Sequence, residues 1–319
     1  MTPASLVRAA AACALVVGAG CGIELTSAQP WVPVAEDDAF GPALRAESAP
    51  PRASAVRTRA PAGGSLVRVV TYNVQYSPDP QAIADAIMSA PALRGAGVFL
   101  LQEQEAYRAE AWSRTARVAE LLGLGYVYVP AREVKGGGTH GLSILSAFPI
   151  ENVERMMLPD AGKGHPRIAM QAEINLGDHR LHVINLHLDT KLNTAERLAH
   201  LRPAVLEAPD TTLVAGDLNT CWVEWVAGKV PVLSSSSASD QALVVDSYMR
   251  ALGFETPTAD SGPTESMFGV EQRLDSMFSR GLAVQFGGVE RVGPSDPVSY
   301  THLRAHETDS YLVCRLLLE

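Results

Sequence analysis

Short apolar runs alternate along the chain with segments in which apolar residues recur three or four positions apart. The runs predict strands over residues 66–74, 97–101, 126–129, 142–146, 167–174, 181–186, 212–215, 274–278 and 282–292. The second pattern predicts helices over residues 79–90, 106–122, 194–206 and 240–252. Strands interleaved with helices indicate a mixed, layered α/β domain.

The first 65 residues differ in composition from this body. An uncharged apolar run over residues 9–20 follows Arg8; it is too short to span a bilayer and is typical of a signal peptide. The sequence Gly-Ala-Gly-Cys ending at Cys21 loosely resembles a bacterial lipobox, which would make Cys21 a lipid-bearing residue. Cleavage near Ala28 by an ordinary signal peptidase is the alternative. We therefore predict an exported bacterial protein, lipid-anchored in the cell envelope or secreted.

These features divide the chain into four parts. We predict a signal peptide over residues 1–21, of lipoprotein type if Cys21 is acylated, and a flexible Pro/Ala-rich linker over residues 22–65. The folded domain is expected over residues 66–297, and a non-native tail over residues 298–319.

Charge is unevenly distributed. The chain has 26 Lys+Arg and 35 Asp+Glu, a net charge of −9, and the first 66 residues contribute five of each sign. With 47% apolar residues, a wholly disordered chain is excluded. The acidic body argues against binding nucleic acid through bulk positive charge. It leaves open an enzyme that engages phosphates through a bound metal ion.

Polar residues recur where the predicted strands end. Asn73, Glu103, His187 and Asp217 each lie at or just after such an end, and Asp275 begins a late strand. An α/β sheet presents catalytic groups at these ends. Carboxylate and amide oxygens are the ligands that Mg²⁺ prefers. Asn and Asp also form ordinary turns there, so the combination, more than any one residue, points to a site.

Five motifs occur in an order that resembles the endonuclease/exonuclease/phosphatase superfamily, the deoxyribonuclease I-like metal-dependent phosphoesterases. They are Thr71-Tyr72-Asn73-Val74, Leu101-Gln102-Glu103, His187-Leu188-Asp189, Gly216-Asp217-Leu218-Asn219 and Arg273-Leu274-Asp275. Residues 141–150 resemble the strand after that family's Gly-rich loop. The resemblance spans residues 66–296 and implies a layered α/β sandwich of two mixed, mainly antiparallel sheets flanked by helices.

The resemblance also implies roles for individual residues. Asn73, Glu103 and Asp296 would bind Mg²⁺ or Mn²⁺, and Asp217 would orient or activate the attacking water. Asn219 would hold the phosphate or help to position the metal, and His187 would donate a hydrogen bond to a phosphate oxygen. The catalytic set is His187, Asp217, Asn219 and Asp275, and the substrate-binding set is Asn219, His187 and Arg167. Arg167 is included because it begins a strand and could contact phosphate; an exposed arginine at a strand edge is the equal alternative.

Other polar residues near these motifs are expected to have smaller roles. Asp189 is expected to shape the turn after His187. His140 and His165 lie in Gly-rich loops near the mouth of the expected site, where they could contact substrate; we expect solvated loop histidines. Arg197 is expected to be a surface or packing residue.

The C-terminus departs from the family pattern. The family closes with Ser-Asp-His, whose histidine partners the position of Asp275, and here Ser295-Asp296 is followed by Pro297. The tail resembles translated adapter or vector sequence, although residues 311–318 are apolar enough to form a substitute strand. We expect the natural parent to be active and this chain to be impaired.

The predicted function is metal-dependent hydrolysis of a phosphodiester by in-line attack of water, nuclease-like or sphingomyelinase-like. The substrate classes left open are nucleic acid, phospholipid and a small phosphodiester, because one fold serves many substrates. The alternative is a catalytically impaired binding protein on the same fold. We expect a monomer.

Overall fold

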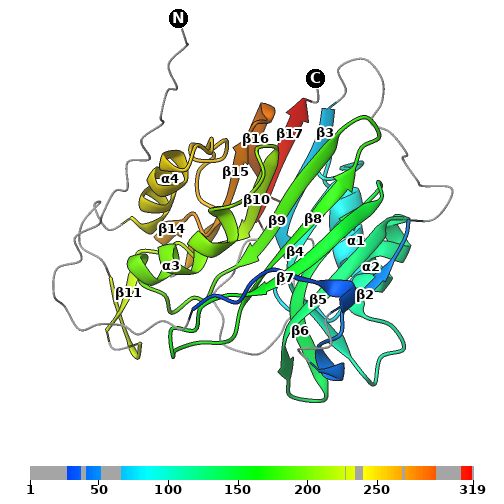
Figure 1. The fold of residues 1–319 in the computed structure, drawn as a ribbon, viewed down its shortest axis with the longest axis horizontal. Helices are drawn as coiled ribbons and strands as arrows, with labels where there is room; N and C mark the ends of the chain where they lie inside the picture. The colour runs from blue at the N-terminus through cyan, green and yellow to red at the C-terminus, as the bar shows by residue number, and fades with distance from the viewer. Residues whose placement is uncertain are drawn as a thin grey trace, which may run out of the picture.

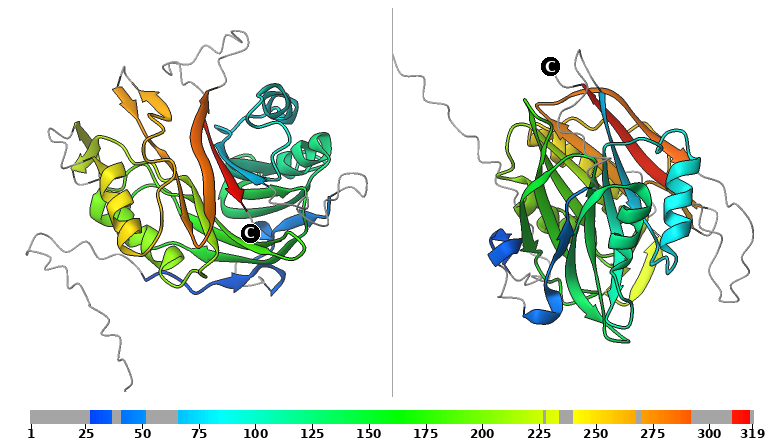
Figure 2. Two further views of the ribbon diagram at one scale, coloured as in Figure 1. Left: turned by 90° about the horizontal axis from the view of Figure 1, so that it is seen from above. Right: turned by 90° about the vertical axis from the view of Figure 1, so that its right-hand side faces the viewer.

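The computed structural model describes residues 27–36, 41–51, 66–226, 228–233, 240–267, 270–291 and 310–317. Two β-sheets pack face to face, and a pair of helices covers the outer surface of each (Figures 1 and 2). The predicted sandwich of two mixed, mainly antiparallel sheets flanked by helices is therefore confirmed.

The first sheet has seven described strands. In spatial order they are β16 (Ala283–Arg291), β17 (Ser310–Leu317), β3 (Leu66–Asn73), β4 (Val98–Tyr107), β6 (Gly138–Ser146), β5 (Gly125–Val134) and β2 (Glu47–Ala49). β3 and β4 run parallel, and all the other neighbours in this sheet are antiparallel.

The second sheet has six described strands. In spatial order they are β1 (Val32–Pro33), β7 (Ile150–Met157), β8 (Ile168–Asn175), β9 (Arg180–His187), β10 (Thr212–Asp217) and β15 (Asp275–Arg280). Here β9 and β10 form the parallel pair. Each sheet thus contains one parallel pair, whose carboxyl ends can present functional groups side by side.

Four helices and two small hairpins complete the described fold. They are α1 (Pro80–Ser89), α2 (Arg114–Leu122), α3 (Thr194–Val205) and α4 (Gln241–Ala251), with hairpins β11 (Val223–Val226)–β12 (Val230–Leu233) and β13 (Glu265–Met267)–β14 (Val270–Gln272). Short 3-10 turns cover Val34–Glu36 and Pro42–Leu44. Side chains cap three of the four helices at their N-termini: Asp79 for α1, Ser113 for α2 and Asp240 for α4.

Three apolar layers hold the sandwich together. Between the sheets, residues such as Leu100, Met170 and Val183 are fully buried. Ile83 of α1 packs on the outer face of the first sheet, and Leu201 of α3 on that of the second. Central strands are buried on both faces, which explains why they read as continuous apolar runs in the sequence.

Two predicted elements need correction. The helix expected over residues 106–122 begins only at Arg114, because β4 continues to Tyr107 and keeps pairing with β6. β7 was not predicted, although it pairs with β8 and β1. Its charged residues Glu151, Glu154 and Arg155 hide the apolar alternation.

The linker prediction for residues 22–65 also differs from the structure. Two pieces of this segment extend the sheets: Val32 pairs opposite Arg155, and Glu47 opposite Tyr128. The described pieces therefore belong to the folded body. The predicted signal peptide, and Cys21 within it, lie outside the described residues. Among the helices that the structure describes, none is long and apolar enough to cross a membrane.

The C-terminal strand prediction matches β17, which pairs with β16 on one side and with β3 on the other. Whether the tail is native stays a prediction. Residues 292–309, which include Asp296 and Pro297, lie outside the described residues.

Candidate active site

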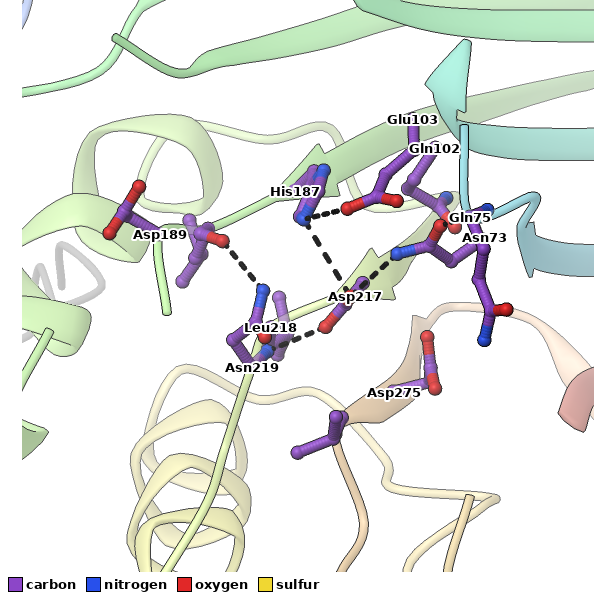
Figure 3. A network of polar contacts seen from close by, with 12 residues as sticks. Asn73, Gln75, Gln102, Glu103, His187, Asp189, Asp217, Leu218, Asn219 and Asp275 are labelled. Carbon is purple, nitrogen blue, oxygen red and sulfur yellow. Dashed lines mark hydrogen bonds and ion pairs between the residues drawn. The ribbon is translucent and has the colours of Figure 1, made fainter. Parts of the chain in front are cut away.

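Strand register brings the polar strand ends together. Asp217 at the end of β10 lies opposite His187 of the parallel strand β9 and opposite Asp275 of β15. In the facing sheet, Asn73 at the end of β3 lies opposite Gln102 of β4. Figure 3 shows Asn73, Glu103, His187 and Asp217 pointing toward one another across the two sheets.

Asp217 is the centre of this group. Its Oδ2 accepts a hydrogen bond of 2.9 Å from Asn73 Nδ2, which links the two sheets directly. Its Oδ1 accepts 2.8 Å from the Asn219 backbone N–H, and Asn219 Nδ2 donates 2.8 Å to the carbonyl of Leu188. Burial raises the pKa of the Asp217 carboxyl, and these donors oppose the rise. The carboxylate is thus fixed in place with both oxygens occupied by donors.

Glu103 reaches the site through a bulge in β4. Leu101 pairs opposite Ser143 and Gln104 opposite Gly141, so one extra residue stands in β4 between these pairs. Glu103 has a φ of 57°, which is uncommon for a residue with a side chain. The bulge turns its carboxylate toward His187 Nε2, 3.8 Å from Glu103 Oε1. Local backbone strain at this position serves the site.

The electrostatics of Glu103 are unusual for a carboxyl group. Burial, followed by the negative charge of Asp217, raises the pKa of Glu103 to about 7. The charge of Arg167 and hydrogen bonds with Tyr76 and Asn73 oppose the rise. Two buried carboxyl groups facing one another in this way leave uncompensated negative potential at the site.

His187 is held as a neutral imidazole. Arg167 Nη1 lies 2.9 Å from His187 Nδ1, and burial together with the Arg167 charge holds the pKa of His187 well below its usual range. A guanidinium group can only donate, so Nδ1 must accept and the ring proton sits on Nε2. Nε2 lies 3.6 Å from Asp217 Oδ2. The Nε2–H bond is therefore directed into the site.

Arg167 is placed behind this histidine. It is 6% exposed, and its Nε lies 3.5 Å from Asp189 Oδ2. Asp189 also accepts hydrogen bonds from the backbone N–H groups of His165 and Lys191. The sequence expectation for Asp189, a turn-shaping residue, is thus only part of its role. Arg167 lies where it can position His187, whereas its sequence-based assignment was to substrate binding.

Asp275 is a third carboxyl group at this end of the sandwich, beside those of Glu103 and Asp217. The Thr264 hydroxyl accepts the Asp275 backbone N–H at 3.2 Å. Burial and the nearby charge of Asp217 raise the pKa of Asp275 well above its usual range. Asp296, predicted as a metal ligand, falls outside the described residues.

A buried polar network lies beneath the site and joins the sheets. Gln102 Nε2 donates to Asn185 Oδ1 at 2.7 Å and to Thr71 Oγ1 at 2.9 Å. Asn185 Nδ2 in turn donates to the carbonyls of Leu101 and Ser143. Because these groups are paired only at one sheet spacing, the network fixes the distance between Glu103 and the residues of the facing sheet.

Arg197 organises the loops around the site from α3. It is fully buried and donates to the carbonyls of Asp189, Leu192 and Leu218, and to Gln241 Oε1 at 2.8 Å. The expectation of a surface or packing residue understates this role. Its contacts hold together the two loops that carry Asp189 and Asn219.

Two aromatic side chains lie beside the site: His140, whose burial the sequence did not predict, and Tyr76, which the sequence did not single out. His140 was expected in a solvated loop, but it is 2% exposed within β6, and burial lowers its pKa to about 3. Its ring lies 5.2 Å from the ring of Tyr76, which hydrogen-bonds Glu103. His165, by contrast, is exposed as expected. Only strand register brings His140 here, so no local sequence signal could reveal it.

The donor set fits a hard divalent cation. Glu103 supplies carboxylate oxygens and Asn73 an amide oxygen, the groups that Mg²⁺ and Mn²⁺ prefer, and Asp217 adds a second carboxylate beside them. The Asn73 oxygen also accepts a hydrogen bond of 2.9 Å from the Gln75 backbone N–H. A cation here would compensate the negative potential of the two facing carboxyl groups. Among the described residues, no three His, Cys, Asp or Glu side chains by themselves form a metal-holding group.

Comparison with known proteins agrees with this geometry. The sequence model of the Endonuclease/Exonuclease/phosphatase family matches residues 70–299. The chain belongs to this family. A search of curated proteins finds no match.

Similar solved structures include three proteins of the same fold. A family protein from Bacteroides thetaiotaomicron is 15% identical, covers 81% of this chain and 99% of its own, and gives a TM-score of 0.54. Sphingomyelinase C from Streptomyces griseocarneus is 17% identical, with coverages of 78% and 99% and a TM-score of 0.52. Humanised TDP2 of D. rerio is 16% identical, with coverages of 79% and 98% and a TM-score of 0.51. At these identities the likeness shows the fold alone.

Proposed function

We propose that this protein is a divalent-metal-dependent phosphoesterase that hydrolyses a phosphodiester by in-line attack of water. One observation carries the proposal: Glu103, Asn73, Asp217 and the Nε2–H of neutral His187 converge from both sheets. Membership in the endonuclease/exonuclease/phosphatase family supports a phosphoester substrate.

Asn73 and Glu103 would hold Mg²⁺ or Mn²⁺, with Asp296 as a further ligand. When bound, the ion supplies charge neutralisation on the phosphate oxygens and on the leaving oxygen. The bulge at Glu103 presents its carboxylate to the site without moving the rest of β4.

The chain's own residues perform the remaining steps. Asp217, held by Asn73 and Asn219, accepts a hydrogen bond from the attacking water and orients it. His187 donates its Nε2–H to a phosphate oxygen, where negative charge develops. Arg167 keeps the histidine in that tautomer by donating to Nδ1. These groups are positioned before substrate arrives, so little reorganisation is required.

Pro297 supports a second candidate function, the binding of a phosphoester with little turnover. Pro297 stands where the family pattern has the histidine that partners the position of Asp275. A chain without this histidine could bind a phosphoester and turn it over poorly. We therefore propose that this exact chain is impaired relative to a Pro297→His variant.

The test compares the chain, Pro297→His, and Pro297→His combined with Glu103→Ala. Substrates are bis(p-nitrophenyl) phosphate, plasmid DNA and sphingomyelin, with Mg²⁺ or with EDTA. Glu133→Ala, an exposed glutamate of β5, is the matched control. We expect hydrolysis that needs Mg²⁺ and Glu103 and is fastest with Pro297→His. If folded Pro297→His cleaves nothing with Mg²⁺, the hydrolase proposal fails and binding becomes the better account.

We also propose where the protein is located and that it is a monomer. The apolar run of residues 9–20 and Cys21 support export, with a lipid anchor in the bacterial cell envelope or secretion. A monomer is proposed, which light scattering of the purified chain tests directly.

A further inference from the structure

A bulge in β5 turns one arginine toward the site. The register of β5 with β6 shifts between Pro130 and Arg132, so Ala131 is an extra residue in β5. After this bulge, Arg132 pairs opposite His140 of β6, and cross-strand partners share one face of a sheet. The ring centre of His140 lies 6.1 Å from that of His187 in the facing sheet. Arg132 therefore lies on the inner face of the first sheet, toward the site.

Gly141 of β6 allows the two strands to approach one another at this bulge. A Cβ on Gly141 would lie 2.1 Å from the Val129 carbonyl oxygen and 2.7 Å from Pro130 Cα. The backbone of β5 thus occupies the place that a side chain on β6 would need. Both strands are shaped for the bulge, and bulges beside functional sites commonly redirect a side chain.

Arg132 has no hydrogen-bond or ion-pair partner among the residues that the structure describes. Its Nε is buried, and the residue as a whole is only partly exposed. The adjacent Glu133 pairs opposite Thr139, so it lies on the other face of the sheet. Buried guanidinium donors are normally satisfied, and their planar fork matches the oxygens of a phosphate. An anionic group of a ligand is therefore the partner that suits Arg132.

The charge of Arg132 reaches the histidines that border the site. Burial is the largest cause of the lowered pKa of His140, His165 and His187, and the charge of Arg132 contributes to all three. In His140 these causes lower the pKa to about 3. The guanidinium thus lies close to the donor side of the site, across from Glu103.

The other charged groups on this side are paired with one another. Arg167 Nε lies 3.5 Å from Asp189 Oδ2. Arg114 Nη1 lies 3.1 Å from Glu105 Oε2, which offsets the carboxylate nearest to this end of β4. Arg132 is therefore the arginine on this side whose charge no described carboxylate offsets.

A narrow cavity lies between the bulge and His187. Its walls include Ala131, His140, Arg167 and His187. His187 directs its Nε2–H to the proposed place of the scissile phosphate, so Arg132 lies beside that phosphate instead of on it. The arginine would meet a group that the substrate carries next to the reacting phosphodiester.

We propose that Arg132 binds a second phosphate group of the substrate, beside the phosphodiester that is hydrolysed. The inference rests on the proposed function, which sets the scissile phosphodiester next to His187 and Asp217. It names the substrate class as phosphodiesters with a further phosphate, a chemistry that nucleotides and inositol phosphates share. A cationic choline headgroup beside Arg132 would be repelled.

The experiment is calorimetric titration of the full chain, with Mg²⁺, using two matched pairs of ligands that are not hydrolysed as diesters. The pairs are thymidine 5′-phosphate with thymidine 3′,5′-bisphosphate, and inositol 1-phosphate with inositol 1,4-bisphosphate. Phosphocholine is the cationic comparison. The variants are Arg132→Gln and Arg132→Lys. Arg94→Gln is the matched control, because Arg94 is exposed ahead of β4, at the end of that strand remote from Glu103.

We expect the second phosphate to strengthen binding roughly tenfold or more in at least one pair, as charge-assisted hydrogen bonds do. Arg132→Gln should lose most of this gain, and Arg132→Lys should keep part of it, because the charge stays but the fork is lost. Arg94→Gln should keep the whole gain. The pair with the larger gain identifies the nucleotide or the inositol phosphate as the source of the second phosphate.

Three results overturn the inference: no gain from the second phosphate in either pair, a gain that Arg132→Gln leaves intact, or phosphocholine bound as tightly as the bisphosphates. Thermal unfolding is recorded for each variant. If Arg132→Gln does not fold, Arg132→Met, which keeps the aliphatic bulk, takes its place. Binding is measured without turnover, so the absence of hydrolysis by folded Pro297→His would refute the proposed function and leave the phosphate-binding result standing.

Discussion

At the scale of single residues, Glu103 shows how the site is built at a cost to the fold. A bulge and a φ of 57° aim its carboxylate at a buried position near another carboxylate. Its raised pKa means that ionisation disfavours the folded state. A bound cation would compensate this cost, which links stability to function.

The first prediction concerns Glu103→Gln in the absence of metal. The pKa of Glu103 rises from 4.5 to about 7 on folding, so the folded state binds more protons between these values. The contribution of Glu103 to the stability of the metal-free protein therefore falls as pH rises from about 4.5 to about 7 and is level above that. Glu103→Gln removes this loss.

Urea unfolding in EDTA measures this effect. We expect Glu103→Gln to be more stable than the unchanged chain at pH 8, by on the order of 2–3 kcal/mol. The two should differ little at pH 4, and Glu133→Gln should match the unchanged chain at both values. A variant that is less stable at pH 8 would contradict the assigned environment of Glu103.

At the scale of elements, close approach of β9 and β10 sets the distance between His187 and Asp217. Gly216 has a φ of 150°, and a Cβ there would lie 1.9 Å from the Leu186 carbonyl oxygen. The backbone of β9 therefore occupies the place of a side chain. Glycine in the Gly-Asp-Leu-Asn motif is a requirement of strand packing as well as of the turn that follows.

The second prediction is that Gly216→Ala destabilises the fold by a few kcal/mol and separates His187 from Asp217. Gly162→Ala is the matched control, because that glycine also has a positive φ and a Cβ there meets nothing within 4 Å. Thermal unfolding should show a much larger loss for Gly216→Ala. Equal losses would mean that φ alone, and not the contact with Leu186, governs this position.

The sequence predicted the strands and helices whose own residues show a clear apolar run or helical spacing. Buried central strands such as β4 and β10 appeared as apolar runs, and strand register brings the polar residues at their ends together. β7 was missed because Glu151, Glu154 and Arg155 interrupt its apolar pattern, and the buried Arg155 is accommodated by the carbonyls of Leu44 and Pro130. The burial of His140 and the place of Tyr76 were missed because only the register of β4 with β6 and the turn after β3 bring them to Glu103.

At the scale of the whole molecule, the C-terminal strand is integrated into the first sheet. β17 lies between β16 and β3, and β16 joins this sheet through β17. β3 ends at Asn73, so one edge of the site strand depends on the pairing with β17. The tail that looks foreign in sequence therefore supports a strand that carries the site.

The third prediction is that a chain ending at Pro297 is less stable and self-associates. Removal of β17 exposes the β3 edge and leaves β16 without its strand partner. Calorimetry should show a lower unfolding temperature, and size-exclusion chromatography should show oligomers. A truncated chain that is monomeric and equally stable would show that the β17 pairing adds nothing to the fold.

The central claim is that Glu103 and Asn73 hold one divalent cation beside Asp217, and calorimetric titration of Mn²⁺ or Mg²⁺ tests it most directly. The account predicts one binding event at pH 8 that weakens toward pH 6, as Glu103 gains its proton. Glu103→Gln should reduce affinity at least a hundredfold, with Glu133→Gln unchanged. Absence of binding, or binding that Glu103→Gln leaves intact, would contradict the account.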